Sequence, residues 1–99
     1  MRASLAISKQ AEKDIDEILD YIYSDNPNSA LALYDKIYSK FLFLTEFPTA
    51  GIKREELYFD LRSYPSDNYI IFYTTDYKRV EIRRVLHTSR NINPEFFNN

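Results

Sequence analysis

The first part of the chain predicts a short strand followed by an amphipathic helix. Leu5 and Ile7 alternate with small neighbours, and this period of two is typical of a strand. Ser8 follows, and a serine at this position can accept the first free N–H groups of a helix. The next apolar residues recur at helical spacing on one face: Ala11, Ile15, Ile18, Leu19 and Ile22. They predict a helix of about four turns that ends near Ser24.

A second amphipathic helix is predicted directly after the first. Pro27 suits the first turn of a helix and Asn26 suits its cap, so the two helices should form a tight hairpin. The expected packing face consists of Ala30, Leu33, Tyr34, Ile37, Phe41 and Leu44. A second apolar stripe, at positions i, i+7 and i+11, consists of Leu31, Tyr38 and Leu42. One contact does not need this much apolar surface, so we interpret the stripe as a partner surface, with cover by the aromatic tail as the alternative.

Patterns with a period of two dominate the second half of the chain. Pro48 and Gly51, the only glycine, mark the break, where Gly51 can supply a positive φ. Residues 53–58 are charged and lack a strong period, which indicates a loop or a short helical turn. Three strand-like runs follow, joined by segments short enough for hairpins: residues 61–64, 69–74 and 80–87. They predict a three-stranded antiparallel meander.

The chain ends in a segment without a clear period. Residues 91–99 resemble a loose tail whose aromatic residues need a surface to rest on. The elements together predict an α+β fold, with an N-terminal strand, a helical hairpin and the three-stranded antiparallel meander. With 99 residues, 44% of them apolar, one domain over residues 1–99 can fill a core without covalent staples.

Composition and charge narrow the chemistry. The chain has no cysteine, which excludes disulfides and thiolate zinc sites, and we expect neither a metal nor a cofactor. The net charge of −2 supplies no global positive field, so we expect no direct binding of nucleic acid. The N-terminus lacks the apolar core of a signal peptide, and no apolar run approaches the roughly 20 residues that span a bilayer. We therefore expect a cytoplasmic protein that does not contact a membrane.

One charged residue interrupts the alternation of the last strand. Arg84 lies between Ile82 and Leu86, where the pattern predicts burial, and such breaks often mark working surfaces. Arg90 follows where the strand gives way to the aromatic tail, and arginine and aromatic residues dominate the hot spots of protein interfaces. The candidate surface for a protein target consists of Arg84, Arg90, Phe96 and Phe97.

The order of these elements and five short motifs resemble a known family. The motifs are EFPTAG (46–51), EEL (55–57), LRSYP (61–65), NYIIFY (68–73) and VEIRRVLHTSRN (80–91). At these spacings the chain resembles the ParE branch of the RelE/ParE toxins of type II toxin–antitoxin systems. The resemblance implies an open sheet with the helical hairpin on one side, a ParD-like antitoxin that wraps the toxin, and poisoning of DNA gyrase without catalysis. Leu31, Tyr38 and Leu42 would then bind the antitoxin.

The rival function within the superfamily is that of a ribosome-dependent mRNA endonuclease of the RelE branch. Its chemistry needs side chains that activate the ribose hydroxyl, neutralise the phosphate and protonate the leaving oxygen. The candidates are Arg62, Arg84 and His87. Thr88 follows where some of these nucleases carry a tyrosine, and the negative net charge fits poorly with docking into a ribosome. The nuclease is therefore the second interpretation.

Structural roles are the alternative for the same residues. A single histidine at a strand end is more often a hydrogen-bonded structural residue than a catalyst. Arg62 and Arg84 would then pack along their stems and pair with carboxylates such as Glu55, Glu56 or Glu81. A third function is that of a non-toxic member that only binds an antitoxin-like partner, and growth arrest on expression separates it from a toxin.

Overall fold

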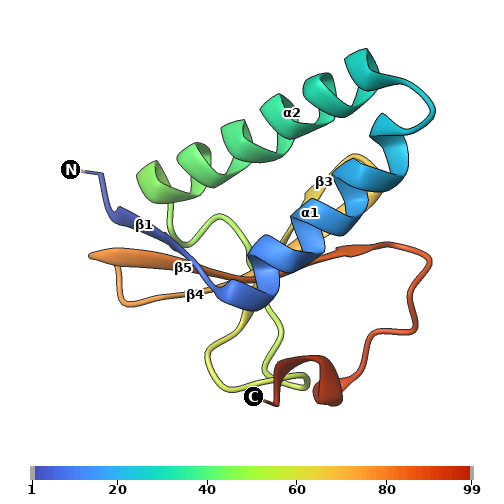
Figure 1. Ribbon diagram of the computed structural model, residues 1–99. Coiled ribbons are helices and arrows are strands. Elements are labelled where there is room, and N and C mark those ends of the chain that lie inside the picture. The colour runs from blue at the N-terminus through green and yellow to red at the C-terminus, as the bar shows by residue number, and fades with distance from the viewer. Residues whose placement is uncertain (1, 99) are drawn as a thin grey trace.

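The helices and strands follow the hydrophobic periods of the sequence, and their boundaries lie where the period changes. A computed structural model describes residues 2–98, so Met1 and Asn99, the end of the predicted tail, lie outside the described residues. The chain order is β1 (Ser4–Ile7), α1 (Lys9–Tyr23), α2 (Pro27–Glu46), β2 (Ile52–Lys53), β3 (Arg62–Ser66), β4 (Tyr69–Thr75), β5 (Arg79–His87) and the 3₁₀ helix η1 (Pro94–Phe97). The predicted α+β class and helical hairpin are confirmed (Figure 1).

Both helices begin at the caps that the sequence predicts. The Ser8 side chain accepts from the Ala11 N–H at 3.1 Å, and the Asn26 side chain accepts from the Ser29 N–H at 3.2 Å. These bonds satisfy N–H groups that have no partner within the helix. The residues of α2 that are buried against the rest of the protein are Ala30, Ile37, Phe41, Leu44 and Thr45. Tyr34 was expected on this face but is 44% exposed, and its ring stacks on the ring of Tyr38 at the outer side.

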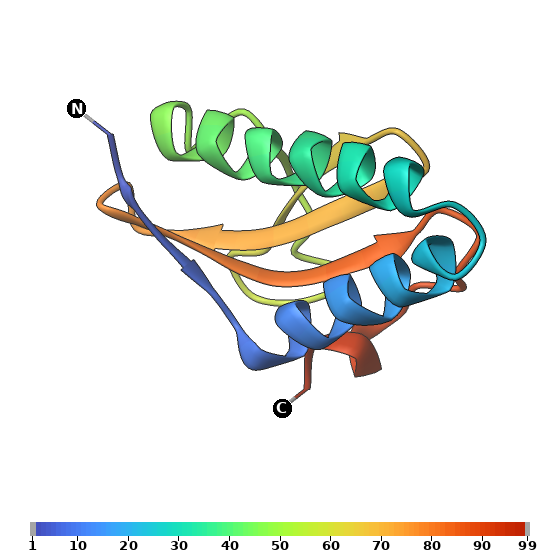
Figure 2. The same cartoon turned by 45° about the horizontal axis from the view of Figure 1, so that its top comes forward.

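The sheet has the strand order β1-β5-β4-β3-β2 in the described part of the chain. The meander β3-β4-β5 is antiparallel as predicted, while β1 joins it as a parallel neighbour of β5 and β2 pairs with β3 at the other edge. Residues 53–58, predicted as loop or a short helical turn, contribute Lys53 to β2 before a hydrogen-bonded turn at Arg54. The two helices lie side by side across one face of the sheet (Figure 2).

A bulge in β5 explains why Arg84 interrupts the apolar pattern. Phe72 of β4 pairs with Arg84, whereas the next residue, Tyr73, pairs with Ile82, so Arg83 is the extra residue. One extra residue reverses which face the following side chains meet. Val80, Ile82 and Val85 therefore all belong to the core under the helices, while Leu86 packs on the opposite face.

The tail docks on the face of the sheet that the helices leave free. Phe97 is 2% exposed and belongs to a second core cluster with Leu57, Leu61, Phe72 and Leu86. Its ring meets the Phe72 ring edge-on with centroids 5.1 Å apart. The prediction of a loose tail is therefore wrong for residues 94–97, which form η1, because Phe97 fills apolar space on this face. The tail lies on the far side of the sheet from α2 and does not cover the outer side of that helix (Figure 1).

Gly51 is required by close packing rather than by a positive φ. Positive φ values occur at Asp60, Asp67 and Tyr77, and Gly51 has none, which corrects the expectation from the sequence. A Cβ at Gly51 would lie 2.6 Å from the Tyr73 hydroxyl oxygen and 2.8 Å from the Ser63 carbonyl oxygen. These distances are too short for a side chain, so only glycine fits between β3 and the Tyr73 ring.

Candidate functional site

The outer side of α2 carries an exposed apolar row, which we call the α2 stripe: Leu31, Tyr34, Tyr38 and Leu42. Leu31 is 61% exposed, and Tyr38 and Leu42 are each 38% exposed. The rings of Tyr34 and Tyr38 are stacked, with centroids 6.1 Å apart, so the aromatic part of the row is ordered by its own contacts. The three residues predicted from the sequence thus share one open face, and Tyr34 joins them.

Two further aromatic residues extend this apolar surface toward the sheet. Phe43 is 37% and Phe47 is 53% exposed, and the Phe43 ring lies 5.0 Å from the Phe47 ring and 5.4 Å from the Tyr64 ring. Beyond them, at the β2 edge, Ile52 is 67% exposed and borders a groove of about 350 Å³. These residues were not predicted from the sequence, although the spacing of Phe43 and Phe47 by one helical turn was a signal.

Arg84 lies in the most buried ion pair of the described chain. Its Nε and Nη2 donate to the two oxygens of Asp14 at 2.7 and 2.9 Å, and its Nη1 donates to the Phe96 carbonyl oxygen at 2.9 Å. The Arg84 and Asp14 side chains are only 12% and 9% exposed. The partner is Asp14 of α1, and not one of the glutamates proposed from the sequence. Arg84 is thus committed to internal contacts, which counts against its predicted direct contact with a target.

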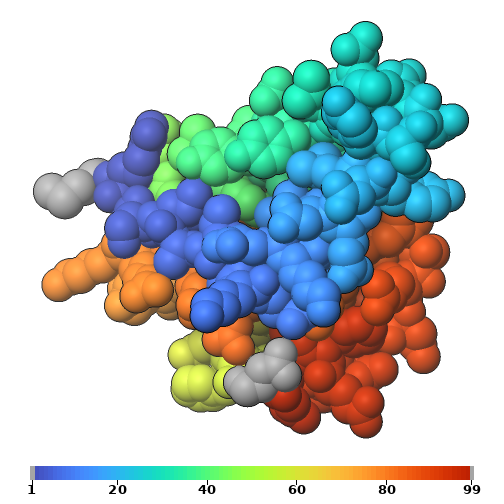
Figure 3. Space-filling model, viewed as in Figure 1, coloured from blue at the N-terminus to red at the C-terminus, as the bar shows by residue number. Residues whose placement is uncertain are grey.

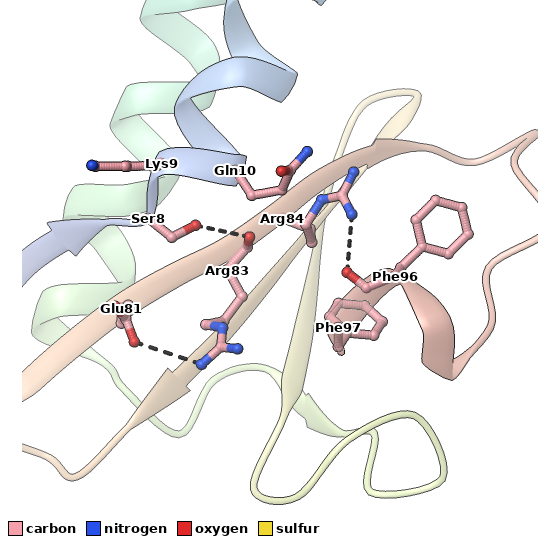
Figure 4. Close-up of a pocket in the computed structure, with 8 residues that line it drawn as sticks. All are labelled: Ser8, Lys9, Gln10, Glu81, Arg83, Arg84, Phe96 and Phe97. Atoms are coloured by element: carbon pink, nitrogen blue, oxygen red, sulfur yellow. Dashed lines mark hydrogen bonds and ion pairs between the residues drawn. The ribbon is translucent and has the colours of Figure 1, made fainter. Parts of the chain in front are cut away.

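The rest of the predicted target surface divides into accessible and inaccessible residues. Arg90 is exposed, and its guanidinium lies 5.0 Å from the centroid of the half-buried Phe96 ring. The Arg84 guanidinium lies 5.3 Å from the same ring. Beside them is a cavity of about 380 Å³ whose lining residues appear in Figure 4. The prediction that Phe97 contacts a target is corrected, because its side chain lies in the second core cluster and cannot meet a partner without leaving that cluster.

The three candidates for nuclease chemistry do not converge. Arg62 pairs with Tyr73 in the β3-β4 ladder and His87 pairs with Tyr69 in the β4-β5 ladder. These β4 positions are four residues apart, which corresponds to about 13 Å along a strand. Arg84 instead pairs with Phe72, a residue of the core on the opposite face. The sheet therefore holds the three side chains at separate places.

Arg62 and His87 each make local contacts. The Arg62 guanidinium donates to the carbonyl oxygens of Gly51 at 2.8 Å and Thr49 at 3.4 Å. The His87 ring meets the Tyr69 ring edge-on, and its Nδ1 accepts from the Ser89 N–H at 3.0 Å. The Nδ1 atom also lies 2.7 Å from the Ser89 hydroxyl. These contacts are those of residues that fix loops at the two ends of the sheet.

Tyr73 fixes the same loop as Arg62. Its hydroxyl accepts from the Gly51 N–H and donates to the Pro48 carbonyl oxygen, both at 2.8 Å. Burial raises the pKa of Tyr73, and the bond from the Gly51 N–H opposes this rise only in part. The hydroxyl therefore keeps the proton that it donates to Pro48. Burial raises the pKa of Tyr69 as well.

The described residues offer neither a cluster of metal ligands nor a membrane-spanning helix. Residues 2–98 contain no group of three or more histidine, cysteine or acidic side chains that could hold a metal ion. No helix in this range is both long and apolar enough to cross a membrane.

The chain matches one protein family over most of its length. Residues 5–92 match the family described as "ParE toxin of type II toxin-antitoxin system, parDE". No curated protein matches the sequence at a significant level.

Two solved structures have similar folds. The toxin–antitoxin structure described as the chromosomal ParDE system from P. aeruginosa has a TM-score of 0.74 and 20% identity, covering 87% of this chain and 96% of that chain. The RelBE2 toxin–antitoxin complex from Mycobacterium tuberculosis has a TM-score of 0.56 and 20% identity, covering 88% and 99% of the respective chains. At this identity the two structures show a shared fold.

Proposed function

The chain belongs to the ParE toxin family of type II toxin–antitoxin systems, and from this membership we propose that it arrests growth by binding DNA gyrase. In this proposal the protein performs no chemistry of its own and acts in the cytoplasm, where gyrase meets DNA. A ParD-like cognate antitoxin neutralises it. The family match over residues 5–92 is the observation that carries the proposal.

The placement of the candidate catalytic residues supports binding rather than catalysis. Cleavage of mRNA needs a base, a phosphate-binding cation and an acid within reach of one ribose and its phosphate. Arg62, Arg84 and His87 lie at separate places on the sheet, and the first two donate to carbonyl or carboxylate oxygens of the protein itself. A nuclease would have to assemble its site from other residues.

The α2 stripe is the proposed binding surface for the antitoxin. Two stacked tyrosines and two leucines face outward here, and the tail lies on the opposite face of the sheet. Each Å² of apolar surface that a partner removes from water contributes roughly 25 cal/mol of favourable free energy. An antitoxin helix or extended segment with apolar residues at matching intervals would bury the row. The proposed surface for gyrase is the accessible part of the tail region, namely the exposed Arg90 and the half-buried Phe96.

A gyrase assay tests the proposal directly. Purified protein should inhibit supercoiling by gyrase or trap cleaved DNA, and it should leave mRNA on translating ribosomes intact. The control is the same protein mixed beforehand with the product of the neighbouring open reading frame, which should restore supercoiling. Codon-specific mRNA cleavage that is lost in His87→Ala would overturn the proposal and favour the nuclease. A folded protein that neither arrests growth nor inhibits gyrase would be the non-toxic binder.

A further inference from the structure

A buried carboxylate on α1 reaches the tail through a single intermediate side chain. Asp14 is 8% exposed and lies one turn from the buried Ala11, at the border of the face that α1 packs against the core. Carboxylates are rarely buried to this degree unless they are paired. Asp14 accepts hydrogen bonds from Arg84 and from the Val85 N–H, and neither the sequence pattern nor the proposed function gives it a role.

The position of Asp14 follows from the length of β1. The parallel strand β1 covers the edge of β5 only as far as Ile82, which pairs with Ile7. Beyond this point no strand within residues 2–98 pairs with that side of Val85, and its N–H donates to Asp14 Oδ2 at 3.1 Å. The carboxylate thus replaces the missing strand at the edge of the sheet, and α1 holds it there.

The same carboxylate fixes the plane of the Arg84 guanidinium. Two nitrogens, Nε and Nη2, donate to its two oxygens, and this paired geometry leaves Nη1 aimed at the tail. Nη1 donates to the Phe96 carbonyl oxygen at 2.9 Å, as Figure 4 shows. On the molecular surface the tail borders α1 directly (Figure 3). Through this link α1 meets β5 and η1, although 70 residues separate Asp14 from Arg84.

We propose that Asp14 is a positioning residue for the tail. By fixing Arg84 it holds the Phe96 backbone against β5, and this arrangement sets Phe96 and Arg90 in their mutual contact. The last step, that this arrangement is the one gyrase binds, rests on the proposed function. The positioning itself does not.

The removal of the Asp14 charge should loosen the tail locally. Arg84 would become a nearly buried cation without a counter-charge, which is strongly unfavourable, so its side chain would turn toward water and release Phe96. Phe97 would then be the remaining anchor of η1. A four-residue 3₁₀ helix has little stability of its own, so its amides report the strength of docking.

Hydrogen exchange of the isolated protein tests the inference. The reporters are the amides of Glu95, Phe96 and Asn98, each of which donates a hydrogen bond within the tail. Their exchange should become faster by about tenfold or more in Asp14→Asn and in Arg84→Lys, with the amides of β4 within about twofold of the parent protein. Asp16→Asn is the matched control, because it removes the same charge from an exposed position of the same helix.

Two results would overturn the inference. One is a folded Asp14→Asn protein whose tail keeps its protection, and the other is faster exchange in the tail and β4 alike, which would make Asp14 a residue of general stability. If Asp14→Asn does not fold, Arg84→Lys decides by the same criteria, because it keeps the charge and loses the paired geometry.

Growth arrest separates this inference from the proposed function. Both substitutions should weaken growth arrest when the tail loosens. A loosened tail with full toxicity would leave the positioning role intact and would remove Arg90 and Phe96 from the proposed gyrase surface.

Discussion

The loop that joins α2 to β2 is held by side chains of two strands. Tyr73 bonds to both Pro48 and Gly51, and Arg62 bonds to the carbonyl oxygens of Thr49 and Gly51. The tyrosine ring approaches the loop so closely that residue 51 has no room for a side chain. The motif EFPTAG and the residues Arg62 and Tyr73 therefore act as one packing unit.

Gly51→Ala should destabilise the protein by about 1–3 kcal/mol. The added methyl group would overlap the Tyr73 ring and the Ser63 carbonyl oxygen. The Ser63 oxygen belongs to the backbone of β3, which cannot move away easily. Thermal or urea unfolding measures the effect. Ala50→Ser is the control, since it adds one atom at the neighbouring exposed position and should be neutral. Equal stability of Gly51→Ala and the parent protein would show that the loop can move away from Tyr73.

Arg90→Ala should weaken growth arrest more than His87→Ala does. Arg90 is exposed beside the Phe96 ring, whereas His87 is engaged with Tyr69 and Ser89. The measurement is the growth of cells that express each variant at equal level. Arg79→Ala is the control, because it removes the same charge at the opposite end of β5. Loss of toxicity in His87→Ala with Arg90→Ala fully toxic contradicts the prediction, provided that both variants are folded.

A deletion of residues 93–99 is a less informative test of the tail. It would remove Phe97 from the second core cluster and expose Leu61, Phe72 and Leu86. Loss of a buried phenylalanine costs about 3–5 kcal/mol, so loss of toxicity could follow from unfolding alone.

At the scale of elements, the helical hairpin carries the surface proposed for the antitoxin. Tyr38→Ser combined with Leu42→Ser should weaken antitoxin binding by more than about tenfold, because each side chain is more than a third exposed and contributes to the row. The affinity for the product of the neighbouring open reading frame is measured by calorimetry. Phe59→Ser, at a residue 77% exposed outside the stripe, is the control. Unchanged affinity together with a large loss of thermal stability would mean that the stripe belongs to the core.

The elements that depend on local sequence could be predicted, and those that depend on distant partners could not. Ser8 and Asn26 predicted the starts of the two helices, because a capping side chain bonds to a backbone N–H within the first turn. Asp14 gave no signal, because its partner Arg84 lies 70 residues away. The pairing of β1 with β5 could not be predicted for the same reason, since an alternating pattern shows that a strand exists but not where it pairs.

The candidate site was predicted in part for the same reason. The exposed row on α2 follows from helical spacing, so Leu31, Tyr38 and Leu42 could be named in advance. The break at Arg84 was visible, but its cause, a bulge that reverses the faces, depends on the register with β4. The burial of Phe97 depends on space left by Phe72 and Leu86 on the far face, which no local pattern reveals.

For the whole molecule, the balance of charge bears on how it meets its target. The net charge is −2, and among the described residues five arginines are paired with acidic side chains: Arg2, Arg54, Arg79, Arg83 and Arg84. Such a surface offers little long-range attraction. Inhibition of gyrase should therefore change by less than about threefold between roughly 50 and 300 mM salt, with the activity of gyrase alone measured at each concentration. A steep fall with salt would indicate a binding mode led by charge.

The pairing of β1 with β5 has a consequence for the time at which the protein gains its fold during synthesis. Ser4 pairs with Arg79 and Ile7 with Ile82, so β1 has no pairing partner until β5 has been synthesised. Contacts between residues so far apart in the sequence cost the chain much conformational entropy when they form, and they form slowly. A nascent chain that ends at residue 78 should consequently show no cooperative unfolding, whereas one that includes η1 should. We therefore expect the cooperative fold to form only after β5 and η1 have been synthesised.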